Sequence, residues 1–142
     1  QIALAVGAHA CHLGQEDFFA AGHSHRSELL PSNSQVRLGL SSHSPPQAQR
    51  AIAVQADYIA VGPVFQTPTK PSAKAVTLDY VRWAAANLTL PWFAIGGINL
   101  RNLDDVLEAG ARRICVVSAI LLANDSAAAC REFKDRLASA KR

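Results

Sequence analysis

The stretch Val61-Gly62-Pro63-Val64-Phe65-Gln66-Thr67-Pro68-Thr69-Lys70 decides the fold. Residues 57–61 form a short apolar run that is typical of a buried strand, and Gly62-Pro63 ends it. The chain then enters a loop that Pro68 stiffens. This loop offers two hydroxyl groups and one cation, on Thr67, Thr69 and Lys70. Ligands bind where the strands of parallel α/β folds end, so we predict an anion-binding loop; a connecting loop with a solvated lysine is the alternative.

Two later apolar runs end in residues that suit the same chemistry. Residues 91–95 run into Gly96-Gly97, and residues 112–117 run into Ser118. Glycine lets a ligand approach the backbone closely, and the N–H groups at the start of a helix favour phosphate. In barrels of alternating strands and helices, a phosphate site commonly follows the last two strands beside a short extra helix, which we expect at 118–122. A tight turn is the alternative for the two glycines, but three strand ends of one kind favour a phosphate site.

Composition limits the class of protein. The chain has 142 residues, 49% of them hydrophobic, and no apolar run near the roughly 18 residues that cross a membrane. Its net charge of +3 comes from 14 basic and 11 acidic residues without a dense basic run, which favours small anionic ligands over nucleic acid. We therefore predict a single domain over 1–142 in the cytoplasm, with no membrane or nucleic-acid partner. The chain has no methionine, so we expect that it begins inside a longer protein or has been cut.

The cysteines give no disulfide pattern. They are odd in number and lack C-x-x-C spacing, and two of them fall in predicted strands. We expect buried, reduced thiols. The three residues are Cys11, Cys115 and Cys130.

The chain alternates regularly between apolar runs and amphipathic segments. We expect strands at 10–13, 36–40, 57–61, 91–95 and 112–117, and helices at 45–55, 78–86, 100–109 and 126–138, after a helix tail at 1–8. Asn99 and Asp125 are the expected N-caps of the last two helices, and Gly110 the expected helix stop. This order predicts a parallel sheet covered by helices. Five strands are too few for an eight-stranded barrel of about 200 to 250 residues, so missing N-terminal units or another copy in a homo-oligomer would cover the sheet edges.

Five motifs, in register from one end of the chain to the other, resemble the thiamine phosphate synthase family. They are residues 12–17 (HLGQED), 39–44 (GLSSHS), 57–70 (DYIAVGPVFQTPTK), 94–98 (AIGGI) and 116–120 (VVSAI). The resemblance implies a (β/α)8 barrel, of which this chain covers about the last five β/α units. It also implies a transferase that joins hydroxymethylpyrimidine diphosphate to thiazole phosphate, with Mg²⁺, and releases diphosphate.

The resemblance assigns roles position by position. It implies that Asp17 is a magnesium ligand, and that Ser41 and Lys70 contact the pyrimidine diphosphate and are the catalytic candidates. The thiazole phosphate would be bound by Thr67, Pro68, Thr69, Gly97, Val117 and Ser118. Such a reaction mainly needs neutralisation of the leaving diphosphate and alignment of the thiazole nitrogen, so no nucleophilic side chain is required.

The chain departs from the family pattern in three respects. It begins after the strands that supply further diphosphate-binding groups and a second magnesium-binding aspartate. Residues 9–11 (HAC) stand where Asp-Gly-Val is usual, and Thr77 stands where a glycine is common. Two other functions therefore remain open. One is a thiazole tautomerase in which His43 transfers a proton, and the other is a non-catalytic paralogue that binds thiazole phosphate.

Overall fold

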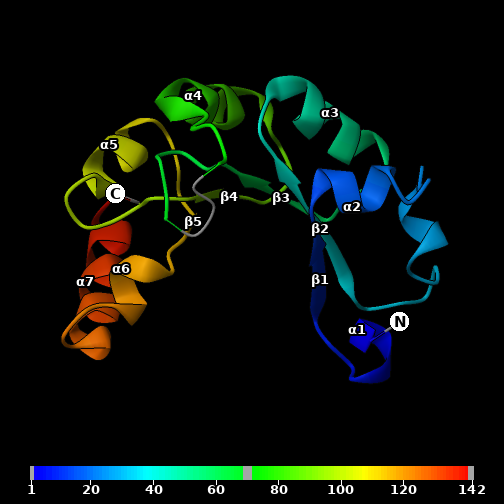
Figure 1. Cartoon of the computed structure of the whole chain (residues 1–142), viewed down its shortest axis with the longest axis horizontal. Coiled ribbons are helices and arrows are strands. Elements are labelled where there is room, and N and C mark those ends of the chain that lie inside the picture. The colour runs from blue at the N-terminus through cyan, green and yellow to red at the C-terminus, as the bar shows by residue number, and fades with distance from the viewer. Residues whose placement is uncertain (1, 69–71, 141–142) are drawn as a thin grey trace. The chain divides into compact units, whose positions relative to one another are not determined.

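The computed structural model describes residues 2–68 and 72–140, and it contains a five-stranded sheet hydrogen-bonded in chain order (Figure 1). The strands are β1 (Ala10–Leu13), β2 (Arg37–Ser42), β3 (Tyr58–Val61), β4 (Trp92–Ile95) and β5 (Ile114–Cys115). The α-helices are α1 (Ile2–Ala5), α2 (Gln15–Phe19), α3 (Pro45–Ala53), α4 (Thr77–Asn87), α5 (Leu103–Glu108), α6 (Ser118–Leu121) and α7 (Ser126–Ser139), and η1 (Arg26–Glu28) is a 3-10 helix. Strands β1 and β2 pair in parallel, as do β4 and β5. The predicted parallel α/β fold is confirmed.

The chain forms two compact units. Unit 1 comprises Gln1–Ala60 and Thr89–Trp92, and unit 2 comprises Val61–Leu88 and Phe93–Arg142. The prediction of a single domain over 1–142 remains a prediction. None of the helices in the described part of the chain has both the length and the apolar character that crossing a membrane requires.

The core of unit 1 forms around β2. Leu38 and Leu40 of this strand are fully buried, as is Phe18 of α2. Helices α2 and α3 both contact β2, and α3 buries Ala48 and Ala51. The alternation of β2 also places Ser42 in the interior, where its hydroxyl donates a hydrogen bond of 3.0 Å to the carbonyl of Ala60. Each buried polar group of this kind needs such a partner, because an unsatisfied one costs about 1–3 kcal/mol.

Helix α2 was not among the predicted helices. Its sequence, Gln15–Phe19, has only one turn and begins with polar residues, so it carries no periodic apolar pattern. The side chain of Asp17 accepts a hydrogen bond from the backbone N–H of Gly14 at 3.2 Å, which stabilises the start of the helix. The single buried aromatic ring of Phe18 then holds the turn against the core.

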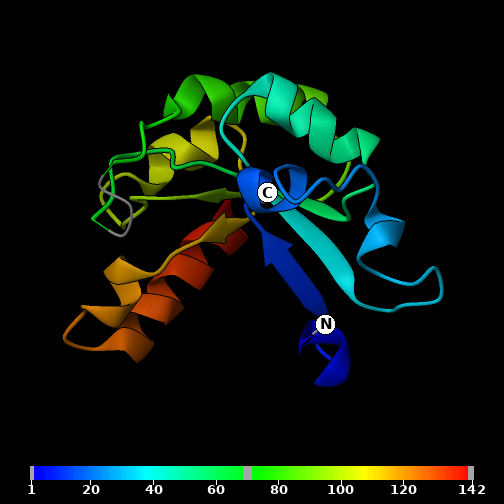
Figure 2. The ribbon, with the colours of Figure 1, turned by 45° about the vertical axis from the view of Figure 1, so that its right-hand side comes forward.

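The core of unit 2 combines aliphatic side chains with the aromatic rings of Tyr80 and Phe133. Val61 and Val64 are buried at the end of β3, and Leu103 and Val106 are buried on α5. Helices α4 and α5 contact each other, and α6 lies beside α7 in both ribbon views (Figure 2). Burying one such side chain contributes about 1.5–3 kcal/mol, so these residues fix the scaffold from which the strand ends emerge.

Several predicted boundaries differ from the structure. The last strand is limited to Ile114–Cys115, and α5 begins at Leu103 rather than near 100. Its N-cap is therefore Asn102, and the prediction of Asn99 was wrong. Asp125 is confirmed as the N-cap of α7, since its carboxylate accepts a hydrogen bond of 2.8 Å from the N–H of Ala128.

The prediction of buried cysteines was also wrong. All three thiols are free, but Cys11 is half-buried and Cys115 and Cys130 are exposed. Cys115 lies on β5, which pairs with β4, and the side chain of this residue does not face the core. An apolar run in the sequence identifies a strand but does not tell which of its faces is covered.

Within the described chain, helices α1, α2, α3 and α5 end with the same hydrogen-bond pattern, and only α3 has a residue other than glycine at the left-handed position. After α5, the N–H of Gly110 donates to Leu107 and the N–H of Ala111 donates to Val106, with Gly110 at φ +100°. After α3, the N–H groups of Gln55 and Ala56 make the corresponding bonds, and Gln55 adopts φ +63°. This Schellman motif normally takes glycine, because a Cβ atom is strained at positive φ.

We predict that Gln55→Gly stabilises the protein by about 0.5–1 kcal/mol, because relief of the left-handed strain exceeds the extra entropy of glycine in the unfolded chain. The midpoint of urea unfolding, at an unchanged m-value, measures this difference. Gln49→Gly is the matched control, since Gln49 is exposed within the same helix. The control is expected to lose about 1 kcal/mol. Equal losses in both variants would contradict the prediction.

Thr77 holds a backbone conformation that normally favours glycine. This exposed residue begins α4 with φ +66°, which is unfavourable for a β-branched side chain. Its hydroxyl accepts a long hydrogen bond, 3.4 Å, from the N–H of Asp79. The backbone is therefore strained at the point where the loop after β3 enters the helix.

We predict that Thr77→Gly stabilises the protein by about 0.5–1 kcal/mol, since a left-handed β-branched residue costs more than glycine loses in chain entropy. Thermal or urea unfolding measures the change. Thr89→Gly is the control, because Thr89 is exposed and has an ordinary negative φ. A Thr77→Gly protein no more stable than the Thr89→Gly protein would refute this account.

Candidate functional site

In unit 2, the segments that follow β3, β4 and β5 emerge at one edge of the sheet. The register pairs Ile95 of β4 with Cys115 of β5, so both strands end at the same level. The loop after β3 continues along β4, with the N–H of Val64 donating to the Ile95 carbonyl at 2.9 Å and the N–H of Phe65 donating to Gly96 at 3.1 Å. The structure therefore places the loop that leads to Thr67 directly beside the Gly96-Gly97 turn.

The Gly96-Gly97 turn leaves no space for side chains. Both residues have positive φ, +97° and +67°. A Cβ atom on Gly96 would lie 2.4 Å from the Cβ of Pro63, and one on Gly97 would lie 2.7 Å from the carbonyl oxygen of Gln66. The turn is thus in close backbone contact with the loop after β3, and only glycine fits at either position.

The predicted phosphate-binding residues of unit 2 lie on these three segments. Thr67 is 8% exposed and Pro68 is exposed, while Thr69 and Lys70 fall outside the described residues. Val117 immediately precedes the short helix α6 and is 47% exposed. Ser118 is the first residue of this helix and is half-buried. The short helix expected after the last strand is therefore present.

In unit 1, Ser41 belongs to a cluster that sequence reasoning missed. Its hydroxyl lies 3.0 Å from Nε2 of His12, and the ring centroid of His12 lies 5.5 Å from that of Tyr58. The parallel register pairs His12 with Gly39, and a Cβ atom on Gly39 would lie 2.0 Å from the ring of Tyr58. The absent side chain of Gly39 makes room for Tyr58 beside His12. The alternation of the two strands was the signal that could have grouped these residues.

Asp17 is an exposed carboxylate on α2, directly after β1. One of its oxygens, Oδ2, accepts the hydrogen bond from Gly14. The described residues contain no group of three His, Cys, Asp or Glu side chains that would hold a metal by themselves. Mg²⁺ is often bound by one or two carboxylates together with the phosphates of a substrate, so a single Asp17 fits a site completed by a diphosphate.

His43, the candidate for proton transfer, directly follows β2 and is exposed. Its backbone N–H donates a hydrogen bond of 2.6 Å to Oε1 of Gln47 on α3. Ser41 and His43 are thus close in sequence at the end of one strand. The structure also groups Asp17 with these two residues in unit 1, and Thr67, Pro68, Gly97, Val117 and Ser118 in unit 2.

Among the residues that the structure describes, Glu28 and Arg136 have shifted pKa values. Hydrogen bonds from the side chain and backbone of Ser24 lower the pKa of Glu28, which is on the surface. A hydrogen bond to Asp104 raises the pKa of Arg136, whose Nη1 also donates to the carbonyl of Leu100 at 2.5 Å. Arg136 thereby joins α7 to the segment after Gly97 as a permanent cation.

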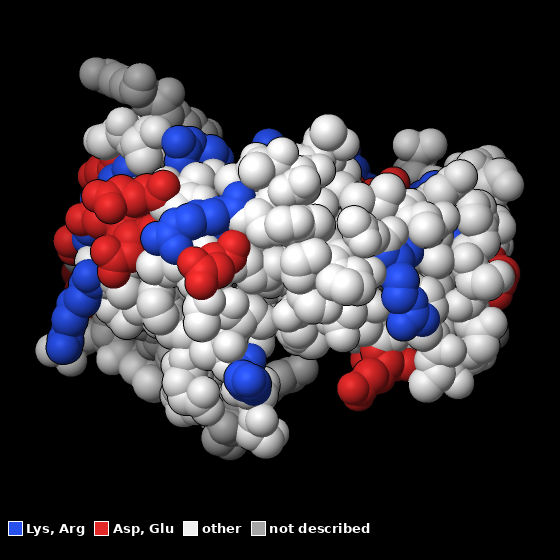
Figure 3. Space-filling model, turned by 90° about the horizontal axis from the view of Figure 1, so that it is seen from above, with Lys and Arg blue, Asp and Glu red and all other residues white. Residues whose placement is uncertain are grey.

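Charges of both signs lie near one another on the surface. On the face drawn in Figure 3, Lys and Arg side chains lie beside Asp and Glu side chains. Neighbouring opposite charges offset each other, so the described residues create no broad single-sign stripe on this face. Such a stripe is what a nucleic-acid backbone would require.

Comparison with known proteins identifies the relatives of this chain. A family model described as thiamine monophosphate synthase matches residues 1–120. The chain is 50% identical over 141 residues to the thiamine-phosphate synthase of Thermus thermophilus, covering 96% of this chain and 63% of the relative. It is 52% identical over 141 residues to that of Acidothermus cellulolyticus, covering 98% of this chain and 64% of the relative.

A solved structure agrees with this relationship. It is a thiamine phosphate pyrophosphorylase from Pyrococcus furiosus, with a TM-score of 0.82 and 33% sequence identity, and the match covers 98% of this chain and 64% of that one. The chain thus spans slightly less than two thirds of the length of these relatives. The family model covers most of the chain and includes every predicted site residue, so the chain belongs to the thiamine monophosphate synthase family.

Proposed function

We propose that this chain carries the substrate-binding strand ends of a thiamine phosphate synthase. The reaction joins hydroxymethylpyrimidine diphosphate to thiazole phosphate and releases diphosphate. Family membership and about 50% identity to enzymes named thiamine-phosphate synthase support the proposal. The proposal includes a (β/α)8 barrel to which this chain contributes about five units, and a cytoplasmic location, because both substrates are phosphorylated metabolites. Whether copies of the chain form a homo-oligomer stays a prediction.

We assign the thiazole phosphate to unit 2. The observation that carries this assignment is the Gly96-Gly97 turn, which packs without side chains against the loop leading to Thr67. Backbone N–H groups and hydroxyls suit a phosphate, and successive N–H groups in a turn can form a concave arrangement that binds anions. Thr67, Pro68, Gly97, Val117 and Ser118 would form this site, together with Thr69, which lies outside the described residues.

We assign the pyrimidine diphosphate to Asp17 and Ser41 of unit 1 and to Lys70, which is outside the described residues. When bound, Mg²⁺ neutralises charge on the leaving diphosphate. Asp17 would hold the ion through a carboxylate oxygen, and the Ser41 hydroxyl would donate to a phosphate oxygen, with His12 fixing its orientation at 3.0 Å. The ammonium group of Lys70 would stabilise the departing anion.

The relatives favour this function over the tautomerase, since the matching family model and the similar proteins named above are all described as the synthase or pyrophosphorylase. The non-catalytic paralogue differs from the synthase in one respect that can be measured. It would bind thiazole phosphate without forming thiamine phosphate.

We predict that the chain binds thiazole phosphate in calorimetry and that Gly97→Ala weakens this binding about tenfold or more, because the added methyl group displaces the turn from the Gln66 carbonyl. Gly7→Ala is the matched control. Gly7 has a similar φ of +63°, but a Cβ atom there meets no described atom within 4 Å. An unmodified chain that gives no heat of binding would contradict the proposed site.

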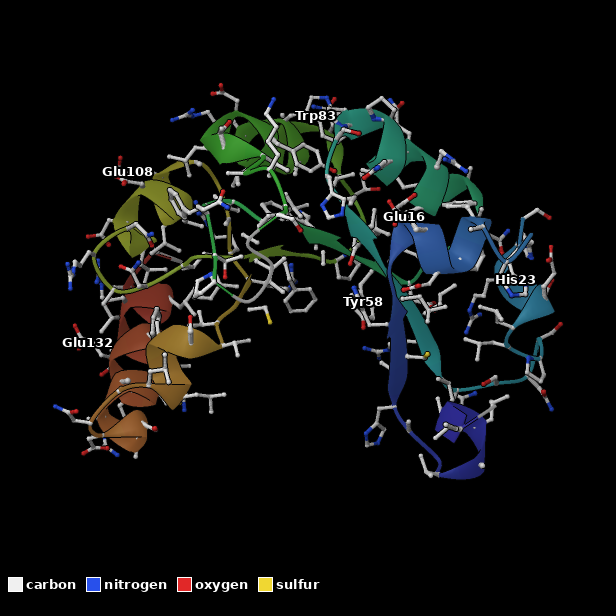
Figure 4. All side chains as sticks on the ribbon, in the orientation of Figure 1. Glu16, His23, Tyr58, Trp83, Glu108 and Glu132 are labelled. Carbon is white, nitrogen blue, oxygen red and sulfur yellow. The ribbon has the colours of Figure 1, made fainter. Side chains whose placement is uncertain are left out.

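We predict that Asp17→Asn lowers kcat/KM for thiamine phosphate formation on the order of a hundredfold, because an amide cannot neutralise the metal that assists diphosphate departure. Asparagine can still accept the hydrogen bond from Gly14, so the fold is retained. The assay uses both substrates with Mg²⁺ and the longest protein in which this chain occurs. Glu16→Gln, an exposed carboxylate on the same helix (Figure 4), is the control and should keep full activity. Equal activities of the two variants would remove Asp17 from the metal site.

A further inference from the structure

Asn102 occupies the N-cap of α5, but its side chain makes no capping hydrogen bond within the described chain. Both of its polar atoms instead reach the turn that precedes the helix. Oδ1 accepts a hydrogen bond of 2.8 Å from the N–H of Asn99, and Nδ2 donates one of 3.0 Å to the carbonyl of Gly97. A residue that could stabilise its own helix thus holds the glycine turn.

We propose that Asn102 is a positioning residue for the thiazole phosphate, acting through the Gly97–Ile98 peptide. This inference rests on the proposed function. The carbonyl of Gly97 also accepts a weaker hydrogen bond, 3.3 Å, from Nδ2 of Asn99. In a trans peptide the N–H points opposite to the C=O, so fixing the Gly97 carbonyl fixes the Ile98 N–H on the side away from Asn102. A backbone N–H held in this way can donate to a phosphate oxygen without reorganising.

The glycine turn is confined on its other side by the loop after β3. A Cβ atom on Gly97 would lie 2.7 Å from both the Gln66 carbonyl oxygen and the Cβ of Phe65. The turn therefore sits between this loop and Asn102, within unit 2. Asn102 consequently sets the separation between Gly97 and the segment that carries Thr67, two parts of the proposed phosphate site.

The backbone around Asn102 is held by several contacts, which fix the point from which the side chain starts. Its N–H donates to the carbonyl of Asn99 at 3.2 Å, and the next residue, Leu103, is fully buried. Arg136 of α7 holds the carbonyl of Leu100 and pairs with Asp104. Because the backbone that carries Asn102 is held on both sides, its side chain can fix the position of the Gly97 carbonyl.

The test compares Asn102→Ala with Asn87→Ala. Asn87 is exposed on α4 of the same unit, and its Nδ2 also donates to a backbone carbonyl, that of Trp83, at 2.8 Å. We expect Asn102→Ala to raise the calorimetric Kd for thiazole phosphate about tenfold or more. In the full reaction it should raise the KM for thiazole phosphate and leave the KM for the pyrimidine diphosphate within twofold. Asn87→Ala should change neither.

A second variant keeps the test decisive if the alanine variant does not fold. Asn102→Asp retains the acceptor for the Asn99 N–H but places a carboxylate oxygen against the Gly97 carbonyl, so it should also weaken binding of thiazole phosphate at least tenfold. A folded Asn102 variant that binds within twofold of the unmodified chain would overturn the proposal and leave the proposed function standing. An unmodified chain that does not bind thiazole phosphate would instead overturn the proposed function and this inference with it.

Discussion

The close approach of two backbone segments governs unit 2. The loop after β3 continues the hydrogen bonding of the sheet past the end of β4, and it does so because Gly96 and Gly97 have no side chains to keep it away. This contact orders the loop that leads to Thr67 without using any charged group. Every assignment of phosphate-binding residues in unit 2 depends on it, because hydroxyls and N–H groups select an anion only when they are held in place.

In unit 1, the candidate binding groups are ordered by contacts between side chains. The C-terminal ends of β1 and β2 present His12 and Ser41 within hydrogen-bonding distance, and the ring of Tyr58 lies over the bare backbone of Gly39 beside His12. The core of unit 1 contains the buried side chains of Leu38, Leu40 and Phe18. A hydroxyl that is already held by a hydrogen bond loses less conformational freedom when a ligand binds.

The sequence predicted the architecture well because the signals for it are local. Apolar runs that end in glycine, proline or serine predicted all five strands. Asp125 correctly predicted the start of α7, and Gly110 correctly predicted the end of α5. The polar turn of α2 was missed, since one buried phenylalanine makes no periodic pattern. Burial of Cys115 and Cys130 was wrongly expected, because exposure depends on which elements cover a face.

The position of a candidate site residue could be predicted from the sequence when the residue belongs to a motif. A contact with a residue of another strand or turn could not be predicted in this way. Gly97, Val117 and Ser118 follow β4 or β5 within three residues, and their roles in binding stay predictions. The contact of His12 with Ser41 joins residues 29 positions apart, and the use of Asn102 in place of Asn99 at the N-cap depends on how the turn folds back. Such choices are decided by tertiary geometry, which propensities do not contain.

The packing of Tyr58 over Gly39 has an evolutionary consequence. The space that the phenol ring fills is the space that any side chain at position 39 would need, since the two would overlap at 2.0 Å. Position 39 cannot change alone: a lineage that gains a larger residue at 39 must first, or at the same time, replace the tyrosine by a smaller residue. The two sites should therefore covary across homologues, although they lie on different strands.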